Sequence, residues 1–292
     1  MSWAIELRQA MPYLRLFQGK IFVIKLGGAL LDQAEALDRL AHQVALLHQL
    51  HIRIVLVHGG GPQANQLAGR LGLDTQTVNG RRVTDPATLE VCKMVFNGRL
   101  NTDLLAALNA HQVPAVGLSG VDAKTIESRR RPPATVRDSE TGKAREIDFG
   151  CVGDIIEVRP ELPHLLLDRS FVPVVSSLTA GQGAEVLNVN ADTVAARLAV
   201  GLKAEKLILL TSAPGVLEDR EDPNSLISHM HMDRLQQILK SSAQGGMHAK
   251  LEACLDALRG GIPQTHIISA LETDSLLVEV FTNEGCGTLI EN

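Results

Sequence analysis

Short runs of apolar residues, rich in valine and isoleucine, alternate along the chain with longer stretches in which apolar residues return every three or four positions. A short continuous apolar run is typical of a strand buried on both faces, and the longer repeat is typical of an amphipathic helix. The apolar runs are IFVIKLGG (21–28), RIVLVHGGG (53–61), VPAVGLSG (113–120), FVPVVSSL (171–178), EKLILLT (205–211), THIIS (265–269) and GTLI (287–290). This alternation predicts an α/β fold, a three-layer αβα sandwich on a mainly parallel open sheet.

The helices are predicted over 34–50, 62–71, 86–110, 188–202, 232–239, 246–258 and 274–281. One stretch, 121–158, breaks the alternation because short polar and apolar pieces surround SETGK at 139–143, and this pattern predicts an antiparallel hairpin excursion. We place a boundary between two lobes near Leu202, with an N-lobe over 21–201, a C-lobe over 202–292 and a separate helix within 1–20.

Composition narrows the class of protein. The 292 residues are 45% hydrophobic, enough for a core in one large domain or two lobes, and the net charge of -5 argues against nucleic acid as the main partner. The basic run SRRRPP (128–133) is too short to change that. No apolar run has transmembrane length, and residues 1–20 carry Glu6 and two arginines, unlike a signal peptide. We expect a cytoplasmic protein without a membrane partner.

The cysteines and histidines form no disulfide or metal pattern. The chain has four widely separated cysteines, Cys92, Cys151, Cys254 and Cys286. Their spacing favours free thiols in a reducing compartment. The close pair His229 and His231 precedes a polar helical stretch, which favours solvated surface. We therefore expect no metal ion ligated by the protein.

Three consecutive glycines follow the second buried strand, in VHGGGPQ at 57–63. Each glycine loses much backbone freedom on folding, so three together indicate positive φ angles or something pressed against bare backbone. The predicted helix beyond them offers free N–H groups and the positive end of its dipole, which suits an anion. A tight strand-to-helix turn without a ligand is the alternative.

Two nucleotide signatures do not fit. In GLSGVDAKT (117–125), Ala123 replaces the final glycine of a P-loop and Leu118 stands where the first should be. GQGAEV (181–186) lacks the third glycine of a dinucleotide fingerprint, and no helix follows GCGTLI (285–290). The missing fingerprint disfavours a nicotinamide oxidoreductase.

Four dispersed pieces remain: IKLGG with Lys25, Gly27 and Gly28; HGGG with Gly60 and Gly61; NVNAD with Asn188 and Asp192; and GGMHAK with Lys250. The first two follow strands, so they meet at the carboxyl edge of the sheet, where open α/β sheets bind ligands. A lysine ending a buried strand is hard to explain as surface, although its side chain can snorkel. From the pattern alone, Asp192 could instead cap a helix.

In this order, the pieces resemble the amino acid kinase family and, within it, the N-acetylglutamate kinases. The resemblance runs from about 21 to 290, and NGRRVTD (79–85) and NVNAD (188–192) make it specific. It implies the amino acid kinase fold with two lobes. It also implies ATP- and Mg²⁺-dependent phosphorylation of the side-chain carboxylate of N-acetyl-L-glutamate, a step of arginine biosynthesis.

The resemblance also implies residue roles. Lys25 and Lys250 would stabilise the transition state, and Asp192 would hold both lysines. Substrate binding would fall to Gly60, Gly61, Arg82 and Asn188, and nucleotide binding to Gly27, Gly28, Thr211, Gly215, Gly246 and Met247. Mg²⁺ would bridge nucleotide oxygens, with few or no protein ligands. Because the nucleophile is a carboxylate already ionised at neutral pH, the reaction needs charge stabilisation and no general base.

Two positions and one short segment depart from the family pattern. Arg81 stands where leucine is usual, so which of Arg81 and Arg82 faces the ligand is open. Ser212 replaces an aspartate, which leaves details of nucleotide contact open. The segment 269–271 also differs, which affects the loop near Ala270.

Two further features suggest regulation. The segment WAIELRQAMPYLRLF (3–17) predicts an apolar-faced helix, with Pro12 placed to kink it, and such a helix needs a partner. Arginine-inhibited N-acetylglutamate kinases carry such an extension, through which dimers interlace into a hexamer, a trimer of dimers. His266, Glu279 and Gly285 resemble the family's arginine site, which implies L-arginine as a feedback inhibitor. The alternative is that 281–290 only turns a helix into an edge strand.

Other functions stay open at this point. A kinase of an aminoadipate derivative in lysine biosynthesis differs by one methylene in its substrate, which is hard to read from sequence. Carbamate and glutamate kinases share the family. A non-catalytic arginine sensor that retains the fold is a candidate from a different class.

Overall fold

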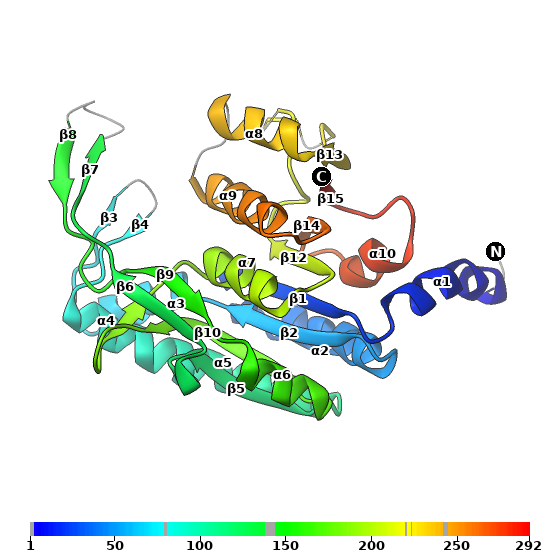
Figure 1. Ribbon diagram of the computed structural model, residues 1–292, viewed down its shortest axis with the longest axis horizontal. Helices are drawn as coiled ribbons and strands as arrows, with labels where there is room; N and C mark the ends of the chain where they lie inside the picture. The colour runs from blue at the N-terminus through cyan, green and yellow to red at the C-terminus, as the bar shows by residue number, and fades with distance from the viewer. Residues whose placement is uncertain (1–2, 79–80, 138–143, 220, 223, 242–244) are drawn as a thin grey trace.

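One mixed sheet runs through the whole molecule, with helices on both of its faces (Figure 1). The computed structural model describes residues 3–78, 81–137, 144–219, 221–222, 224–241 and 245–292. The predicted three-layer α/β class is confirmed. SETGK lies outside the described residues.

The main sheet has the order β13-β15-β14-β12-β1-β2-β10-β6-β9, and β5 and β11 also pair with β10. The strands are β1 (Ile21–Leu26), β2 (Arg53–His58), β3 (Thr77–Val78), β4 (Arg81–Arg82), β5 (Ala115–Gly120), β6 (Ile126–Arg130), β7 (Ala134–Arg137), β8 (Ala144–Ile147), β9 (Gly153–Val158), β10 (Val172–Ala180), β11 (Val186–Asn188), β12 (Lys206–Thr211), β13 (His229–His231), β14 (Gln264–Ser269) and β15 (Thr288–Glu291). The central pairings β14–β12–β1–β2–β10–β5 are all parallel.

Helices cover the sheet in two layers (Figure 1). They are α1 (Trp3–Phe17), η1 (Gly28–Asp32), α2 (Ala34–Gln49), α3 (Gly61–Arg70), α4 (Pro86–Lys93), η2 (Met94–Leu100), α5 (Asn101–Ala110), η3 (Asp122–Lys124), α6 (Glu161–Asp168), α7 (Ala191–Leu202), α8 (Met232–Ser241), α9 (Gly245–Arg259) and α10 (Ser275–Phe281). One apolar core joins the sheet to α2, α3, α4, α5 and α10, and a second joins its other face to α6, α7, α8 and α9.

Strand β1 shows how the apolar pattern fixes the two faces. Phe22 and Ile24 enter the core on the α2 side, whereas Val23 enters the core on the α7 side. Side chains alternate along a strand, so Lys25 follows Val23 toward α7. Its backbone pairs with β2 and β12, at Val57 and Leu209, which puts a lysine in the middle of the sheet.

Several elements differ from the sequence prediction, and helix α6 and strand β11, for example, were not predicted. The single helix expected over 86–110 has a π-helical segment, η2, between α4 and α5. It brings Phe96 and Leu100 against Gly60 and brings Asn97 to 2.5 Å from the Ser176 hydroxyl, which donates to it. Strand β13 was not predicted, because three residues are too few for a periodic signal.

The excursion predicted over 121–158 is antiparallel, as expected: β6 pairs with β9, and β7 pairs with β8. The lobe boundary near Leu202 coincides with no break in the sheet, because β12 pairs with β1 directly beyond it. The division into 1–20, 21–201 and 202–292 stays a prediction. Within the described residues, no helix has the length and apolarity needed to cross a bilayer.

Helix α1 projects from the body of the molecule beside α10 (Figure 1). The helix continues through Pro12. Its last turn is anchored because the ring of Phe17 packs edge-on against Phe22 of β1, with centroids 5.2 Å apart, and Tyr13 donates to the side chain of Asn283. Met11 and Leu16 remain exposed apolar side chains on this helix.

Candidate active site

Two lysines share one carboxylate at the carboxyl edge of the sheet. Lys25 Nζ, from the end of β1, lies 2.7 Å from Asp192 Oδ1, and Lys250 Nζ, from α9, lies 3.4 Å from Asp192 Oδ2. The three side chains are 9%, 14% and 6% exposed for Lys25, Lys250 and Asp192. The fold therefore brings three of the four dispersed sequence pieces into one buried cluster, the lysine–aspartate cluster.

The charges of this cluster do not cancel. Burial raises the pKa of Asp192, but the two lysines outweigh it and hold that pKa below its ordinary value. Burial lowers the pKa of Lys25, Asp192 opposes this, and Lys250 lowers it further. With both lysines protonated, the cluster carries one positive charge in excess. A buried excess charge of this kind favours an anionic ligand.

Asp192 is not the cap of α7. The cap is Asn190, whose side-chain oxygen accepts from the Asp192 backbone N–H at 2.7 Å. The Asp192 carboxylate is thus free to face the lysines from the first turn of α7. The capping interpretation of Asp192 is wrong.

The glycine loops after β1 and β2 touch each other. A Cβ added at Gly28 would lie 3.0 Å from Pro62 Cδ, and one at Gly27 would lie 3.0 Å from the Leu210 carbonyl oxygen. These contacts agree with the expectation that both loops meet at one edge. They also leave little room for a side chain there.

Close packing explains Gly60. A Cβ added there would lie 2.4 Å from Leu100 Cδ1 and 2.7 Å from Phe96 Cδ1, so η2 excludes any side chain. At Gly61, the carbonyl oxygen accepts from the Arg82 guanidinium. The three-glycine run therefore fits between η2 and Arg82, and its backbone lies beside the predicted substrate arginine.

Arg82 and Asn188 are held by different neighbours. Arg82 reaches Gly61 and the thiol of Cys92, whereas the side chain of Arg81 lies outside what the structure describes. The Asn188 amide donates to the Thr84 hydroxyl at 3.2 Å, and its backbone N–H donates to the Cys151 carbonyl at 2.8 Å. Thr84 connects Arg82 to Asn188, because it lies two residues after Arg82 in the chain and its hydroxyl accepts from the Asn188 amide.

Sequence analysis missed a buried histidine behind the glycine loop. The Asn101 amide donates to His58 Nε2 at 3.0 Å, so Nδ1 carries the proton and donates to the Gly59 carbonyl at 2.9 Å. Burial lowers the pKa of His58 to about 4, which keeps the ring neutral at neutral pH. Its position at the end of a buried strand, directly before Gly59, was the available signal.

The predicted nucleotide residues of the C-lobe have varied surroundings. The backbone of Thr211, at the end of β12, lies close to Gly27. Gly215 packs against Thr288, whose hydroxyl would lie 2.6 Å from an added Cβ. Gly246 faces open space, and Met247 is partly buried against the α7–α9 core. Packing alone accounts for the glycine at 215.

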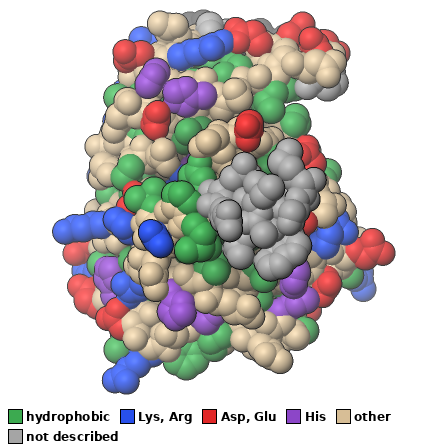
Figure 2. Space-filling view, turned by 90° about the vertical axis from the view of Figure 1, so that its right-hand side faces the viewer, with side chains coloured by type: hydrophobic (Ala, Val, Ile, Leu, Met, Phe, Trp, Pro, Cys, Tyr) green, Lys and Arg blue, Asp and Glu red, His purple; other side chains and the backbone are tan. Residues whose placement is uncertain are grey.

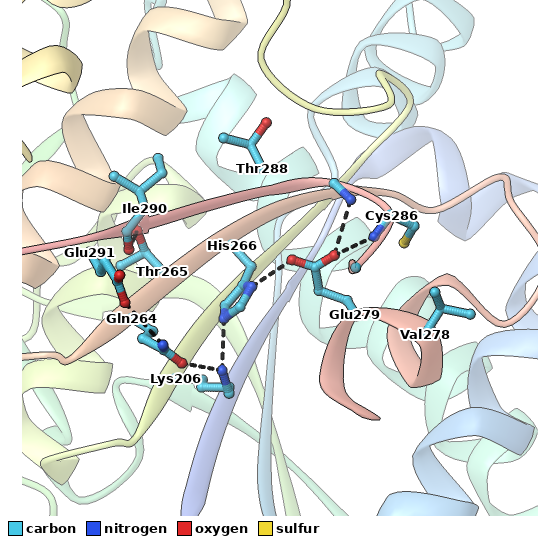
Figure 3. Close-up of polar contacts among 12 residues, drawn as sticks. Lys206, Gln264, Thr265, His266, Val278, Glu279, Cys286, Thr288, Ile290 and Glu291 are labelled. Carbon is cyan, nitrogen blue, oxygen red and sulfur yellow. Dashed lines mark hydrogen bonds and ion pairs between the residues drawn. The ribbon is translucent and has the colours of Figure 1, made fainter. Parts of the chain in front are cut away.

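The predicted effector residues form a buried network on the other face of the sheet (Figure 3). His266 Nδ1 lies 2.7 Å from Glu279 Oε1, and the backbone N–H groups of Cys286 and Gly287 donate to Glu279 Oε2 at 2.8 and 3.0 Å. Gly285 has φ +63°, and an added Cβ would lie 2.7 Å from Glu279 Oε2.

Lys206 belongs to the same network and was not predicted. Its Nζ lies 3.0 Å from His266 Nε2 and 5.0 Å from the centroid of the Phe17 ring of α1. Burial lowers the pKa of Lys206 to about 8, although Glu279 opposes the shift. The end of α1 therefore packs directly on this network.

The chain is similar to known proteins over nearly its whole length. The pattern described as "Amino acid kinase family" matches residues 20–269. The acetylglutamate kinase of Myxococcus xanthus is 45% identical over 285 residues, which cover 97% of this chain and 92% of that protein. That of Methanothermobacter thermautotrophicus is 42% identical over 284 residues, with 97% of each chain covered.

This chain belongs to the amino acid kinase family. Among solved structures, it is similar to N-acetylglutamate synthase from Neisseria gonorrhoeae complexed with coenzyme A and N-acetyl-glutamate, with a TM-score of 0.85 and 27% identity. For the complex of that synthase with coenzyme A and L-arginine, the TM-score is 0.81 and the sequence identity is 26%. Both matches cover 100% of this chain but 64% and 66% of the synthase, so this amino acid kinase spans about two thirds of it.

The lysine–aspartate cluster predicts a large effect of one substitution. Asp192→Asn leaves two buried ammonium groups without the carboxylate between them, which should lower the free energy of unfolding by about 3 kcal/mol at neutral pH. Urea unfolding measures this. The control Asp168→Asn removes an exposed partner of Arg53 and should lower the free energy of unfolding by at most about 1 kcal/mol. Equal losses in the two variants would contradict the role of the cluster.

The buried His58 predicts a pH dependence. Its folded pKa of about 4 lies below the unfolded value of about 6.5, so the unfolded chain binds more protons between these values and stability falls as pH falls. Protonation of His58 should lower the free energy of unfolding by roughly 3 kcal/mol between pH 7 and pH 4.

The measurement compares each protein with its own stability at pH 7. His58→Gln should flatten the fall between pH 6.5 and 4, whereas His51→Gln, at an exposed position, should not. An unchanged slope in His58→Gln would show that another group is responsible.

Proposed function

We propose that this protein is an acetylglutamate kinase, which transfers a phosphoryl group from ATP to the side-chain carboxylate of N-acetyl-L-glutamate in arginine biosynthesis. The observation that carries the proposal is the sharing of one carboxylate, Asp192, by Lys25 and Lys250 at the carboxyl edge of the sheet. The acetylglutamate kinases similar to this chain over nearly its full length support it. The reaction belongs in the cytoplasm, where ATP is available.

The chemistry matches the excess charge of the cluster. An anionic carboxylate must approach a polyanionic phosphate, and negative charge then moves onto the leaving group. Lys25 comes from β1 and Lys250 from α9, so the two ammonium groups reach the reacting groups from different elements. Asp192 keeps both side chains oriented before the ligands arrive, which lowers the cost of reorganisation.

The residues around the cluster fit a nucleotide phosphate chain. Gly27 and Gly28 leave backbone exposed in a tightly packed place with little room for a side chain, and bare backbone of this kind suits close approach to phosphate. When bound, ATP supplies the phosphoryl group and Mg²⁺ neutralises part of its charge. Because Asp192 is engaged by two lysines, Mg²⁺ would take phosphate oxygens and water as ligands. Thr211, Gly246 and Met247 would border the nucleotide.

The acceptor would lie against the second glycine loop. Arg82 now donates to the Gly61 carbonyl, and its planar fork suits a substrate carboxylate. The backbone N–H groups of Gly60 and Gly61 and the amide of Asn188 would complete the site. His58 fixes the Gly59 carbonyl and so orients the loop from behind.

L-Arginine would act as a feedback inhibitor at the network of His266, Glu279 and Gly285. The Glu279 carboxylate suits a guanidinium, and the synthase solved with L-arginine is similar to the whole of this chain. Helix α1, which ends on this network, would link dimers into a hexamer. Inhibition then requires that arginine binds one arrangement of the lobes more tightly than the other. The coupling free energy between arginine and substrate binding would be about 1–3 kcal/mol.

The two lysines should act mainly on the transition state. Lys25→Ala and Lys250→Ala are each expected to lower kcat by roughly 10²–10³-fold with little change in the KM for N-acetylglutamate. Arg82→Ala should instead raise that KM by roughly 10–100-fold, because a charged hydrogen bond is lost. ADP release is the measurement, with Lys93→Ala, at an exposed lysine paired to Glu90, as the control.

The same assay separates the alternatives. Activity only with an aminoadipate derivative would support the lysine-pathway kinase, and no activity with any acceptor would support an arginine sensor. If all three substitutions changed KM alone, the division of roles would be wrong.

Arginine regulation is tested with the intact chain and with a chain lacking residues 1–18. Millimolar arginine should inhibit the intact enzyme, and Glu279→Gln should weaken that inhibition. The truncated chain should show a smaller particle mass by light scattering. Full activity of the intact enzyme at millimolar arginine would contradict the effector site, and an unchanged mass would contradict the role of α1.

A further inference from the structure

Three potential metal ligands gather on the edge of the sheet. Strand β13 carries His229 and His231 on one face, because side chains alternate, while Met230 between them is 2% exposed in the core on the other face. Its neighbour β15 places Glu291 directly opposite His231. We expected solvated histidines here, and both are indeed exposed. The β13–β15 pairing, however, adds a carboxylate to them.

The ligand atoms are close together. His229 Nε2 lies 3.0 Å from Glu291 Oε1, the two imidazole rings are 5.0 Å apart, and one donor atom from each of the three residues lies within 4.8 Å of the others. Figure 2, which views this side of the molecule, shows histidine side chains gathered near acidic ones in its upper part. Among the described residues, no other such trio meets.

The donor set selects a class of ion. Two imidazoles and one carboxylate suit Zn²⁺ and its borderline-soft neighbours, whereas Mg²⁺ prefers oxygen ligands alone. Ligands on a tetrahedral Zn²⁺ at about 2.1 Å lie about 3.4 Å from one another. One pair is already at 3.0 Å, and rotation of exposed side chains can close the remaining gap, since His229 is 44% and Glu291 32% exposed.

Neighbouring groups orient two of the ligands. Glu291 Oε2 accepts from the Gln264 amide at 3.1 Å, and Gln264 accepts in turn from Lys206, along a row of residues that runs across β12, β14 and β15. The other ring nitrogen of His231, Nδ1, lies 3.4 Å from the Asn292 carbonyl, which leaves Nε2 for an ion. Such outer contacts are usual around metal ligands.

We propose that His229, His231 and Glu291 bind one divalent transition metal ion of the Zn²⁺ class, at a site separate from the lysine–aspartate cluster. The ion ties β13 to β15 and leaves a fourth position for water. Through Gln264 and Lys206, the site borders the His266–Glu279 network.

Calorimetric titration of untagged, chelator-treated protein with Zn²⁺, in buffer containing Mg²⁺, tests the proposal. The intact chain should bind one Zn²⁺. Gln264→Ala should bind it roughly 10–100-fold more weakly because Gln264 orients a ligand, and the double variant His229→Ala/His231→Ala and the single variant Glu291→Gln should each weaken binding further. Co²⁺ should give the intense visible bands of a tetrahedral site in the intact chain but not in the variants that lose one of the three ligands.

The matched control is His42→Ala/His111→Ala. That pair also has adjacent rings, 5.6 Å apart, and His111 lies 2.8 Å from an Asp38 oxygen, but these residues form no such trio. The control should bind Zn²⁺ as the intact chain does. No Zn²⁺ binding by the intact chain, or an equal loss in the control, would overturn the proposal. Thermal unfolding without metal checks that each variant folds.

Discussion

A single buried carboxylate organises this molecule. Lys25 sits in the middle of the sheet, where an ammonium group is stable only beside a counter-ion, and Asp192 supplies that counter-ion from the first turn of α7. Because Asp192 also reaches Lys250, the start of α7 and the start of α9 must both approach the end of β1. The glycine loops that follow β1 and β2 then lie together at the carboxyl edge of the sheet. The excess positive charge is thus a consequence of how the elements are held together.

Much of the fold and part of the site could be read from the sequence, for a physical reason. Buried strands in a parallel sheet are continuous apolar runs, and their carboxyl ends share an edge, so Lys25 and the glycine loops had to meet. The roles of Arg82 and Asn188 came only from the resemblance. Other features depend on contacts between distant segments, which no local pattern records. The tautomer of His58 depends on Asn101 in α5, and the position of Lys206 depends on its pairing to β14.

The lysine–aspartate cluster and the His266–Glu279 network lie on opposite faces of the sheet, and strand β1 connects them. Strand β1 presents Lys25 to the face covered by α7 and Phe22 to the opposite face. Phe22 packs on Phe17 of α1, and Phe17 in turn lies over Lys206, which contacts the His266–Glu279 pair. One strand therefore carries both the lysine that we propose as catalytic and the contact surface for α1. A movement of α1 relative to the body would act on the strand that ends in the proposed active site.

The contact between Gly60 and η2 has a consequence for divergence within the family. The space that a side chain would need at position 60 is filled by Phe96 and Leu100, which the π-helical geometry of η2 directs there. Position 60 and the two η2 positions therefore share one volume. A relative that gains a side chain in the loop must lose bulk in the helix, or lose the π-helical segment altogether. In relatives, substitutions at position 60 should therefore occur together with substitutions at positions 96 and 100.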